Sequence, residues 1–130
     1  YNYIYFYITA NKKMDFTIDL SLKNNVNEEL VIRNNGNIVS KPTVTIYGAD
    51  TINISLNTVQ VFVIELGNEG FITIDVAYMN AYKEGVLKNR LVTGNYDNFV
   101  LNVGKNIINV TGNVTKINIE NFSRWIWRWW

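Results

Sequence analysis

At 130 residues, the chain is long enough for one domain with a true hydrophobic core, in which roughly two-thirds of the unfolded surface becomes buried. Hydrophobic residues make up 48% and charged residues 18%, and no apolar run approaches the roughly 18 residues of a membrane span, so we expect a soluble globular chain. The formal net charge is only +1, from 12 basic and 11 acidic side chains, which excludes a strong electrostatic footprint for nucleic acid or an anionic membrane.

The residue types that are missing exclude most catalytic chemistry. The chain has no cysteine and no histidine, so a Ser-His-Asp triad, a Cys-His pair and thiolate or imidazole metal sites are impossible. No glycine-rich loop leads from a predicted strand into a helix, so a phosphate cradle has no support. An enzyme would need two carboxylates, or an oxygen-ligated metal, brought together by the fold. We therefore predict no catalytic residues, no cofactor and no metal.

Alternation of residue types predicts strands at the beginning of the chain. Residues 1–9 alternate tyrosine with other apolar side chains, and residues 14–22 have the clearest period-two pattern of the sequence. The short polar link between these two segments favours an antiparallel hairpin. Residues 30–32 predict a short strand, and the asparagine and glycine residues of 34–37 predict a turn.

The middle of the chain predicts three further strands. Pro42 opens the first, because proline at the start of a strand removes no ladder hydrogen bond. Residues 48–50 then predict a turn, and residues 52–56 alternate again. Residues 59–64 are apolar on both faces, which is typical of a central strand.

Within residues 70–85, the spacing of the hydrophobic residues changes. Residues 71–74 predict a strand, after which Asp75 can cap a helical turn, and Tyr78 and Tyr82 stand four residues apart. We expect one or two helical turns that end at Gly85, with both tyrosines on one side. Two interpretations remain open for them: a lid that packs over the open end of a sandwich, or a ligand site.

The last strands are predicted at residues 99–103, 106–110 and 114–119, after a surface loop at residues 88–98. Val114 is out of phase with Ile117, so either a bulge lies at Thr115 and Lys116 or the inward face changes there. Together these segments predict an all-β, antiparallel β-sandwich of about ten strands, in a single domain over residues 1–130. The predicted core residues are Ile18, Leu20, Val44, Ile46, Ile54, Val61, Ile74, Ile108, Ile117 and Ile119.

Residues 122–130 hold all four tryptophans of the chain beside two arginines. Alternate tryptophans predict a strand, and Trp125 is expected to pack back on the domain. Tryptophan and arginine are also enriched at binding hot spots. The candidate contacts with a partner or a glycan are Trp127, Arg128, Trp129, Trp130, Tyr78 and Tyr82.

Several segments, in order, resemble the C-terminal part of the distal tail protein of long-tailed phages that infect Gram-positive bacteria, a family of siphovirus-type tail components. Residues 40–48, Ser-Lys-Pro-Thr-Val-Thr-Ile-Tyr-Gly, are similar to its Ser-x-Pro-x-Ile-x-Ile-Tyr-Gly strand, and residues 71–83 resemble its Tyr-Ile-x-Ile-Asp…Ala-Tyr-Lys segment. Residues 104–108 and 112–119 resemble its paired final strands. Arg124 and Trp125 fall where members carry a Trp/Arg-rich close. Val100 and Ser123 stand where members often have proline, so the local turns are expected to differ.

The resemblance implies a galectin-like or jelly-roll-like sandwich that belongs to a longer tail protein, whose ring-forming N-terminal domain precedes this chain. It implies a structural, non-enzymatic component of the baseplate hub of a phage or prophage, made in the bacterial cytoplasm and located in the virion tail. The partners would be tail tube, tip or receptor-binding proteins, with no nucleic acid and no membrane. The full-length protein would form a ring of identical subunits, and the isolated chain a monomer or weak oligomer. The alternative is a carbohydrate-binding module, because exposed tyrosine and tryptophan on a β-sandwich can stack on sugar rings.

Overall fold

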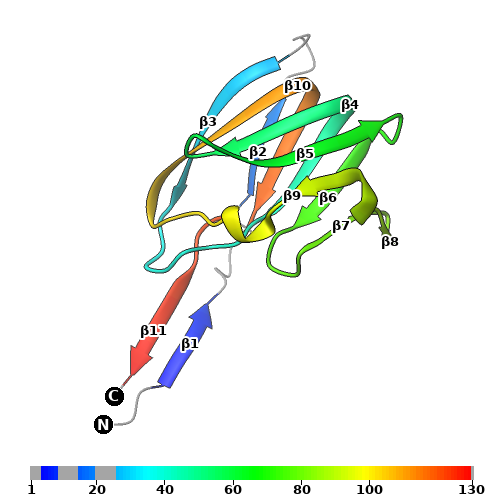
Figure 1. Ribbon diagram of the computed structural model, residues 1–130. Helices are drawn as coiled ribbons and strands as arrows, with labels where there is room; N and C mark the ends of the chain where they lie inside the picture. Colours follow the sequence, from blue (N-terminus) through cyan, green and yellow to red (C-terminus); the bar gives the residue numbers. More distant parts are fainter. Residues whose placement is uncertain (1–3, 9–14, 20–25, 130) are drawn as a thin grey trace.

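The computed structural model describes the backbone of residues 4–8, 15–19 and 26–129, and the side chains of residues 29–125. This part of the chain forms eleven strands and two short 3₁₀ turns, η1 (Asn89–Leu91) and η2 (Tyr96–Asn98), in a mainly antiparallel, sandwich-like arrangement (Figure 1). The all-β class is therefore confirmed. Within the described residues, no helix has the length and apolar character needed to cross a membrane.

Two long strands, β4 (Thr43–Leu56) and β10 (Gly104–Glu120), pair with each other and run through both layers of the sandwich. Each strand bends about halfway, where register shifts interrupt the pairing (Figure 1). Gly48 lies at the bend of β4, and a Cβ atom there would stand only 2.1 Å from the carbonyl oxygen of Asn113. Only glycine permits this close approach of the two backbones.

One layer contains the second half of β4 and the first half of β10. Its strand order is β3-β10-β4-β5-β9, with β3 at Val26–Asn34, β5 at Val59–Gly67 and β9 at Val92–Gly94. The prediction of a central strand at residues 59–64 is confirmed, because β5 lies between β4 and β9.

The other layer contains the remaining halves of the two long strands. Its order is β2-β10-β4-β6-β7-β8, with β2 at Asp15–Asp19, β6 at Phe71–Asp75, β7 at Asn80–Lys83 and β8 at Val86–Leu87.

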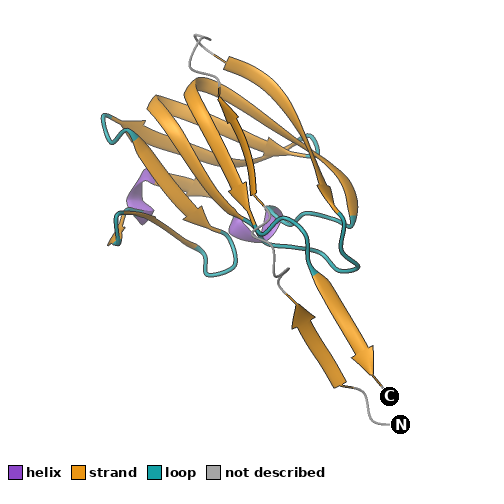
Figure 2. Cartoon of the chain, turned by 180° about the vertical axis from the view of Figure 1, so that it is seen from behind, coloured by secondary structure: helices purple, strands orange, loops and turns teal. Residues whose placement is uncertain are grey.

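The remaining two strands, β1 (Ile4–Ile8) and β11 (Trp125–Trp129), form a separate two-stranded sheet. Figures 1 and 2 show this β1–β11 arm leading away from the sandwich, with the start of β1 and the end of β11 at its far tip. The strand predicted in the tryptophan-rich segment is confirmed. The predicted hairpin between the first two strands is wrong, because β1 pairs with β11 and β2 pairs with the distant β10.

The core lies between the two layers. Eight predicted core residues are buried, whereas the side chains of Ile18 and Leu20 lie outside the described part of the chain. The eight confirmed residues are Val44, Ile46, Ile54, Val61, Ile74, Ile108, Ile117 and Ile119. The largest side chains among the other fully buried residues are Phe62 and Phe99.

Some predicted boundaries are wrong, because a strand bends and continues at positions where a turn was expected. Residues 48–50 do not end a strand but lie inside β4, and the predicted strands at 106–110 and 114–119 are one strand, β10. The irregularity after Val114 is confirmed as a register shift between Val114 and Lys116. Residues 99–103 contribute only an isolated bridge between Leu101 and Ser40.

The helical turns predicted for residues 76–85 are also wrong. These residues form a turn followed by β7, whose Ala81 pairs with Ile74 of β6. Both side chains are fully buried, so the β6–β7 hairpin adds apolar burial that an isolated helical turn would not provide. Asp75 still acts as a cap, since its Oδ1 accepts a hydrogen bond from the backbone N–H of Tyr78 at 3.2 Å.

Candidate functional site

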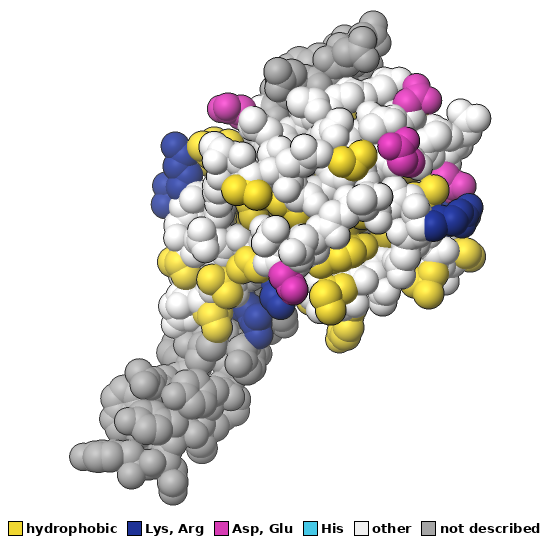
Figure 3. Space-filling view, in the orientation of Figure 1, with side chains coloured by type: hydrophobic (Ala, Val, Ile, Leu, Met, Phe, Trp, Pro, Cys, Tyr) yellow, Lys and Arg dark blue, Asp and Glu magenta, His cyan; other side chains and the backbone are white. Residues whose placement is uncertain are grey.

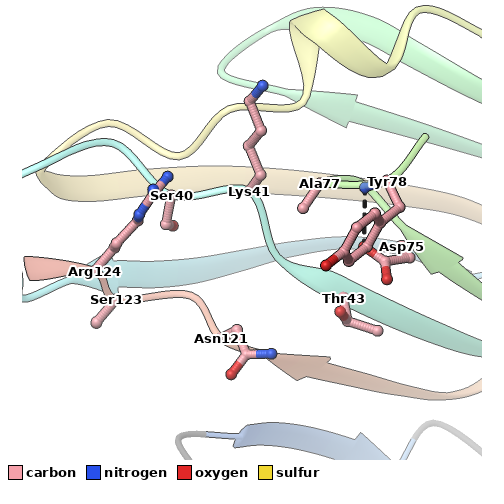
Figure 4. Close-up of a pocket in the computed structure, with 9 residues that line it drawn as sticks. All are labelled: Ser40, Lys41, Thr43, Asp75, Ala77, Tyr78, Asn121, Ser123 and Arg124. Atoms are coloured by element: carbon pink, nitrogen blue, oxygen red, sulfur yellow. Dashed lines mark hydrogen bonds between the residues drawn. The ribbon is translucent and has the colours of Figure 1, made fainter. Parts of the chain in front are cut away.

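A hollow of about 370 Å³ lies where the chain passes from the sandwich into the β1–β11 arm. Its walls come from separate parts of the sequence: the β3–β4 connection and the start of β4, the end of β6 with the turn after it, and the segment between β10 and β11 (Figure 4). The lining residues are Ser40, Lys41, Thr43, Asp75, Ala77, Tyr78, Asn121, Ser123 and Arg124.

The turn after β6 forms one wall. The backbone N–H of Val76 donates to the carbonyl oxygen of Pro42 at 3.2 Å, which fastens the turn to the start of β4. The Asp75 cap and a bond from the N–H of Met79 to the carbonyl oxygen of Val76 (3.3 Å) hold the turn itself. On this fixed backbone the Tyr78 side chain remains 78% exposed. Its ring is therefore available for contact with something outside the sandwich.

The opposite wall is held by buried polar side chains. Ser123 Oγ accepts a hydrogen bond from the backbone N–H of Asn35 at 2.9 Å, and Ser40 Oγ donates to the carbonyl oxygen of Phe122 at 2.8 Å. Asn34, only 1% exposed, accepts at Oδ1 from the backbone N–H of Arg124 at 3.2 Å. These contacts fasten the segment before β11 to the β3–β4 connection, so the wall is set before any ligand arrives.

Gly36 allows the two segments of this wall to approach each other. A Cβ atom at Gly36 would lie 1.6 Å from the carbonyl oxygen of Arg124, which is far inside van der Waals contact. The same carbonyl accepts hydrogen bonds from the backbone N–H groups of Asn37 (3.0 Å) and Ile38 (3.3 Å). The glycine is required by close backbone approach rather than by a turn alone.

The hollow combines an aromatic ring, neutral polar groups and an excess of positive charge. Figure 4 shows Arg124 with Ser40 and Ser123 at one end and Asp75, Tyr78 and Thr43 at the other, with Lys41 extending from the β3–β4 connection between them. Two cationic side chains and one carboxylate give the lining a formal charge of +1. Such a set of groups is suited to binding a polar ligand by hydrogen bonds and ring contact.

The structure separates the residues that the sequence grouped as candidate contacts. Tyr78 lines the hollow, but Tyr82 lies on β7, opposite Thr73, and does not. Trp127, Arg128 and Trp129 belong to β11, although their side chains, and all of Trp130, lie outside the described part. Trp125 is partly buried, and its expected packing on the domain stays a prediction.

Tyr47 and Phe71 form a second aromatic surface, which is less available to a ligand than the Tyr78 ring. Tyr47 and Phe71 lie side by side on the outer face of one layer, with ring centroids 5.4 Å apart. Lys116 Nζ stands 4.1 Å from the Tyr47 centroid, and Lys83 Nζ stands 5.1 Å from the Phe71 centroid. Because lysines already occupy these ring faces, the surface offers little room for stacking by a ligand.

Other features give no sign of a reaction centre in the part of the chain that the structure describes. No group of three or more acidic side chains there is placed to hold a metal ion. Acidic and basic side chains are scattered over the face seen in Figure 3. The pKa of Tyr96 is raised by desolvation, but this residue packs edge-on against Phe62, with centroids 5.0 Å apart, and does not line the hollow.

Sequence reasoning identified Tyr78 but missed most of the hollow. Lys41, Thr43 and Asn121 lie in separate segments with no motif spacing to connect them, so only their convergence in space marks them. Asn34 and Gly36 were visible as a turn signal, which did not predict their contacts with Arg124. No protein-family model matches the chain, and neither the curated proteins nor the solved structures include a significant match to it.

Proposed function

We propose that this chain is a structural domain of a phage or prophage tail, in the hub that joins the tail tube to the tip and receptor-binding proteins. Support comes from the segments that resemble the distal tail protein family. These segments contribute β4, β6, β7 and β10, which are neighbours in the order β10-β4-β6-β7. Motifs that are distant in sequence thus belong to one contiguous part of the sheet.

The observation that carries the proposal is the β1–β11 arm. It pairs the two ends of the described chain outside the sandwich, and its register places Phe6 opposite Trp127. A two-stranded ribbon is at best marginally stable alone, so a further protein surface that covers the arm would stabilise it. The composition of β11, Trp-Ile-Trp-Arg-Trp, is of the kind found at protein hot spots. We therefore assign the contact with other tail proteins to residues 127–130.

Deletion of residues 127–130 tests this assignment. Among the described strands, β11 pairs only with β1, so the melting temperature of the sandwich should be nearly unchanged. Binding to tail proteins, or self-association, should fall. The measurements are thermal unfolding by circular dichroism and pull-down with the tail tube and tip proteins. If the deletion unfolds the sandwich, the segment belongs to the folded core and the arm is not the contact.

The proposal also predicts where the protein is found. Mass spectrometry of purified particles should detect it, and antibody labelling should place it at the distal end of the tail. Its absence from intact particles would refute the tail function. The isolated chain should sediment as a monomer or weak oligomer, so a stable hexamer at low micromolar concentration would move the ring-forming contacts into the sandwich.

The second candidate is a carbohydrate-binding module. The observation that favours it is the exposed Tyr78 ring beside the hollow, since aromatic side chains present a flat apolar face together with a polar group. Binding to a glycan array that is lost in Tyr78→Ala would support this candidate. Neighbouring genes for a tape-measure protein and a tip protein would instead favour the tail hub.

A further inference from the structure

We infer that the hollow binds an anionic saccharide, with the sugar ring against Tyr78 and its carboxylate or phosphate toward Lys41 and Arg124. The inference rests on the carbohydrate-binding candidate and specifies the charge of the ligand. The hollow, at about 370 Å³, falls within the usual range for small-ligand sites.

Beside the hollow, an exposed aromatic side chain stands on an ordered backbone. Three hydrogen bonds fix the turn that carries Tyr78, and one of them joins the turn to the start of β4. The Tyr78 side chain on this fixed turn is 78% exposed. Figure 4 shows its ring beside Asp75 and Thr43, at one side of the hollow. The binding surface is therefore pre-organised, which lowers the entropic cost of binding.

Polar groups surround the hollow next to that ring. Near the ring, the Asp75 carboxylate uses Oδ1 for the Tyr78 N–H, and its other oxygen can accept a sugar hydroxyl. Thr43 provides a hydroxyl on the same side, and the exposed Asn121 provides an amide from the segment that leads to Arg124. A neutral hydroxyl and amide, together with a carboxylate and an aromatic ring, suit the alternating hydroxyl and C–H surfaces of a sugar.

Two cationic side chains also line the hollow. Arg124 lies across the hollow from Asp75 and Tyr78, and Lys41 extends from the β3–β4 connection between them (Figure 4). Within the described part of the chain, the Lys41 ammonium has no hydrogen bond or ion pair, whereas Lys83 and Lys88 are both paired with Glu69. A ligand that spans the hollow would thus meet hydrogen-bonding groups at one end and positive charge at the other. A sugar with an acidic substituent fits both ends, because its hydroxyls can meet the hydrogen-bonding groups and its anion the positive charge.

Calorimetric titration of the 130-residue chain tests the inference with three probes of equal length: a neutral galacto-oligosaccharide, an oligogalacturonate and a phosphorylated galacto-oligosaccharide. We expect at least one acidic probe to bind about three- to tenfold more tightly than the neutral one, as one or two exposed ion pairs allow. Added salt should reduce this preference. The comparison of the two acidic probes identifies the preferred anion.

Two matched pairs of variants locate the site. Tyr78→Ala should abolish binding of all three probes, and Tyr82→Ala, outside the hollow, should not. Lys41→Gln should remove most of the preference for the acidic probe, whereas Lys105→Gln, at an exposed position of β10 away from the hollow, should retain it. Melting curves of all four variants show whether each one is folded.

The possible outcomes are distinct. Equal affinity for neutral and acidic probes, with loss in Tyr78→Ala, overturns the inference but leaves the carbohydrate-binding candidate standing. A preference reduced equally by Lys41→Gln and Lys105→Gln reflects general charge attraction and also overturns it. No binding of any probe at millimolar concentration overturns both the inference and the candidate, without bearing on the tail function.

Discussion

Asn34→Ala is the substitution that most directly tests how the end of the sandwich is held together. The Asn34 side chain is 1% exposed and makes four hydrogen bonds. Its Nδ2 donates to the carbonyl oxygens of Ile38 (2.8 Å) and Leu101 (3.3 Å). Its Oδ1 accepts from the backbone N–H groups of Gly36 (3.0 Å) and Arg124 (3.2 Å). One side chain thus joins the β3–β4 connection to two distant segments.

The expected cost follows from the groups that alanine would leave behind. The carbonyl oxygen of Leu101 keeps a second hydrogen bond, from the backbone N–H of Ser40 at 3.0 Å. The carbonyl oxygen of Ile38 and the N–H of Gly36 lose the partner that the structure shows for them, and a buried group left unsatisfied costs about 1–3 kcal/mol. Because these groups are only partly buried, we expect a total loss of about 2–5 kcal/mol. A loss of 3 kcal/mol would lower the melting temperature by roughly 10 °C.

Urea unfolding followed by circular dichroism measures this loss as a shift of the midpoint at constant slope. Asn35→Ala is the matched control, because Asn35 is the exposed neighbour and only its backbone N–H is seen to hydrogen bond. Its stability should stay within about 0.5 kcal/mol of the parent. If both variants unfold at the same midpoint, the Asn34 hydrogen bonds do not stabilise the fold and the reasoning fails.

Asn34→Asp adds a pH-dependent check. The new carboxylate would keep the acceptor but face the carbonyl oxygens of Ile38 and Leu101, so its folded pKa should lie above the unfolded value of about 3.9. The unfolded state then binds fewer protons than the folded state between the two pKa values, and stability falls as pH rises through that window. Relative to the parent protein, this variant should therefore regain stability as pH falls from 7 toward 4. No change in the difference with pH would argue against the assigned contacts.

Three further predictions concern packing and burial. Ile46→Ala and Ile108→Ala, at positions 0% and 2% exposed, should each cost about 2–5 kcal/mol, and unchanged melting curves would contradict their place in the core. The hydroxyl of Tyr96 is buried and has no hydrogen-bond partner among the described residues, so Tyr96→Phe should be neutral or stabilising by up to about 1 kcal/mol, and a larger loss would indicate a missing partner. Because desolvation raises the folded pKa of Tyr96, the parent should lose stability above about pH 10, and Tyr96→Phe should remove that part of the alkaline loss in pH-dependent unfolding curves. Gly36→Ala should destabilise the fold strongly, since its Cβ would collide with the carbonyl oxygen of Arg124, and a melting temperature equal to the parent's would show that the two segments can separate freely.

The sequence alone identified most of the long strands and which of their faces are buried. Alternation is a local property of an extended backbone, so the inward positions of Ile46, Ile54 and Ile108 could be identified without knowing any neighbour. The irregularity after Val114 was also predictable, because a break in phase within one strand has to be absorbed in that strand. The missing histidine and cysteine limited the possible chemistry in the same direct way.

Only the tertiary structure decided which strands pair. The first two strands looked like a hairpin because their link is short, yet β1 pairs with β11 and β2 with β10. A period-two pattern shows which face of a strand is buried, but it does not show which other strand will form hydrogen bonds with its backbone. The helical turn predicted after Asp75 was wrong for a similar reason. Burial of Ala81 opposite Ile74 favours a β-hairpin over the helical turn that the local residue spacing predicted.

The candidate site was the least predictable feature from the sequence. Tyr78 stood out as an aromatic residue, but Lys41 and Asn121 are ordinary polar residues until the fold brings them to one hollow. Asn34 indicated a turn, although its hydrogen bonds reach 67 residues to Leu101 and 90 residues to Arg124. Local sequence records what a residue can do with its neighbours in the chain. Contacts between distant segments depend on the bends of β4 and β10, which set where those segments meet.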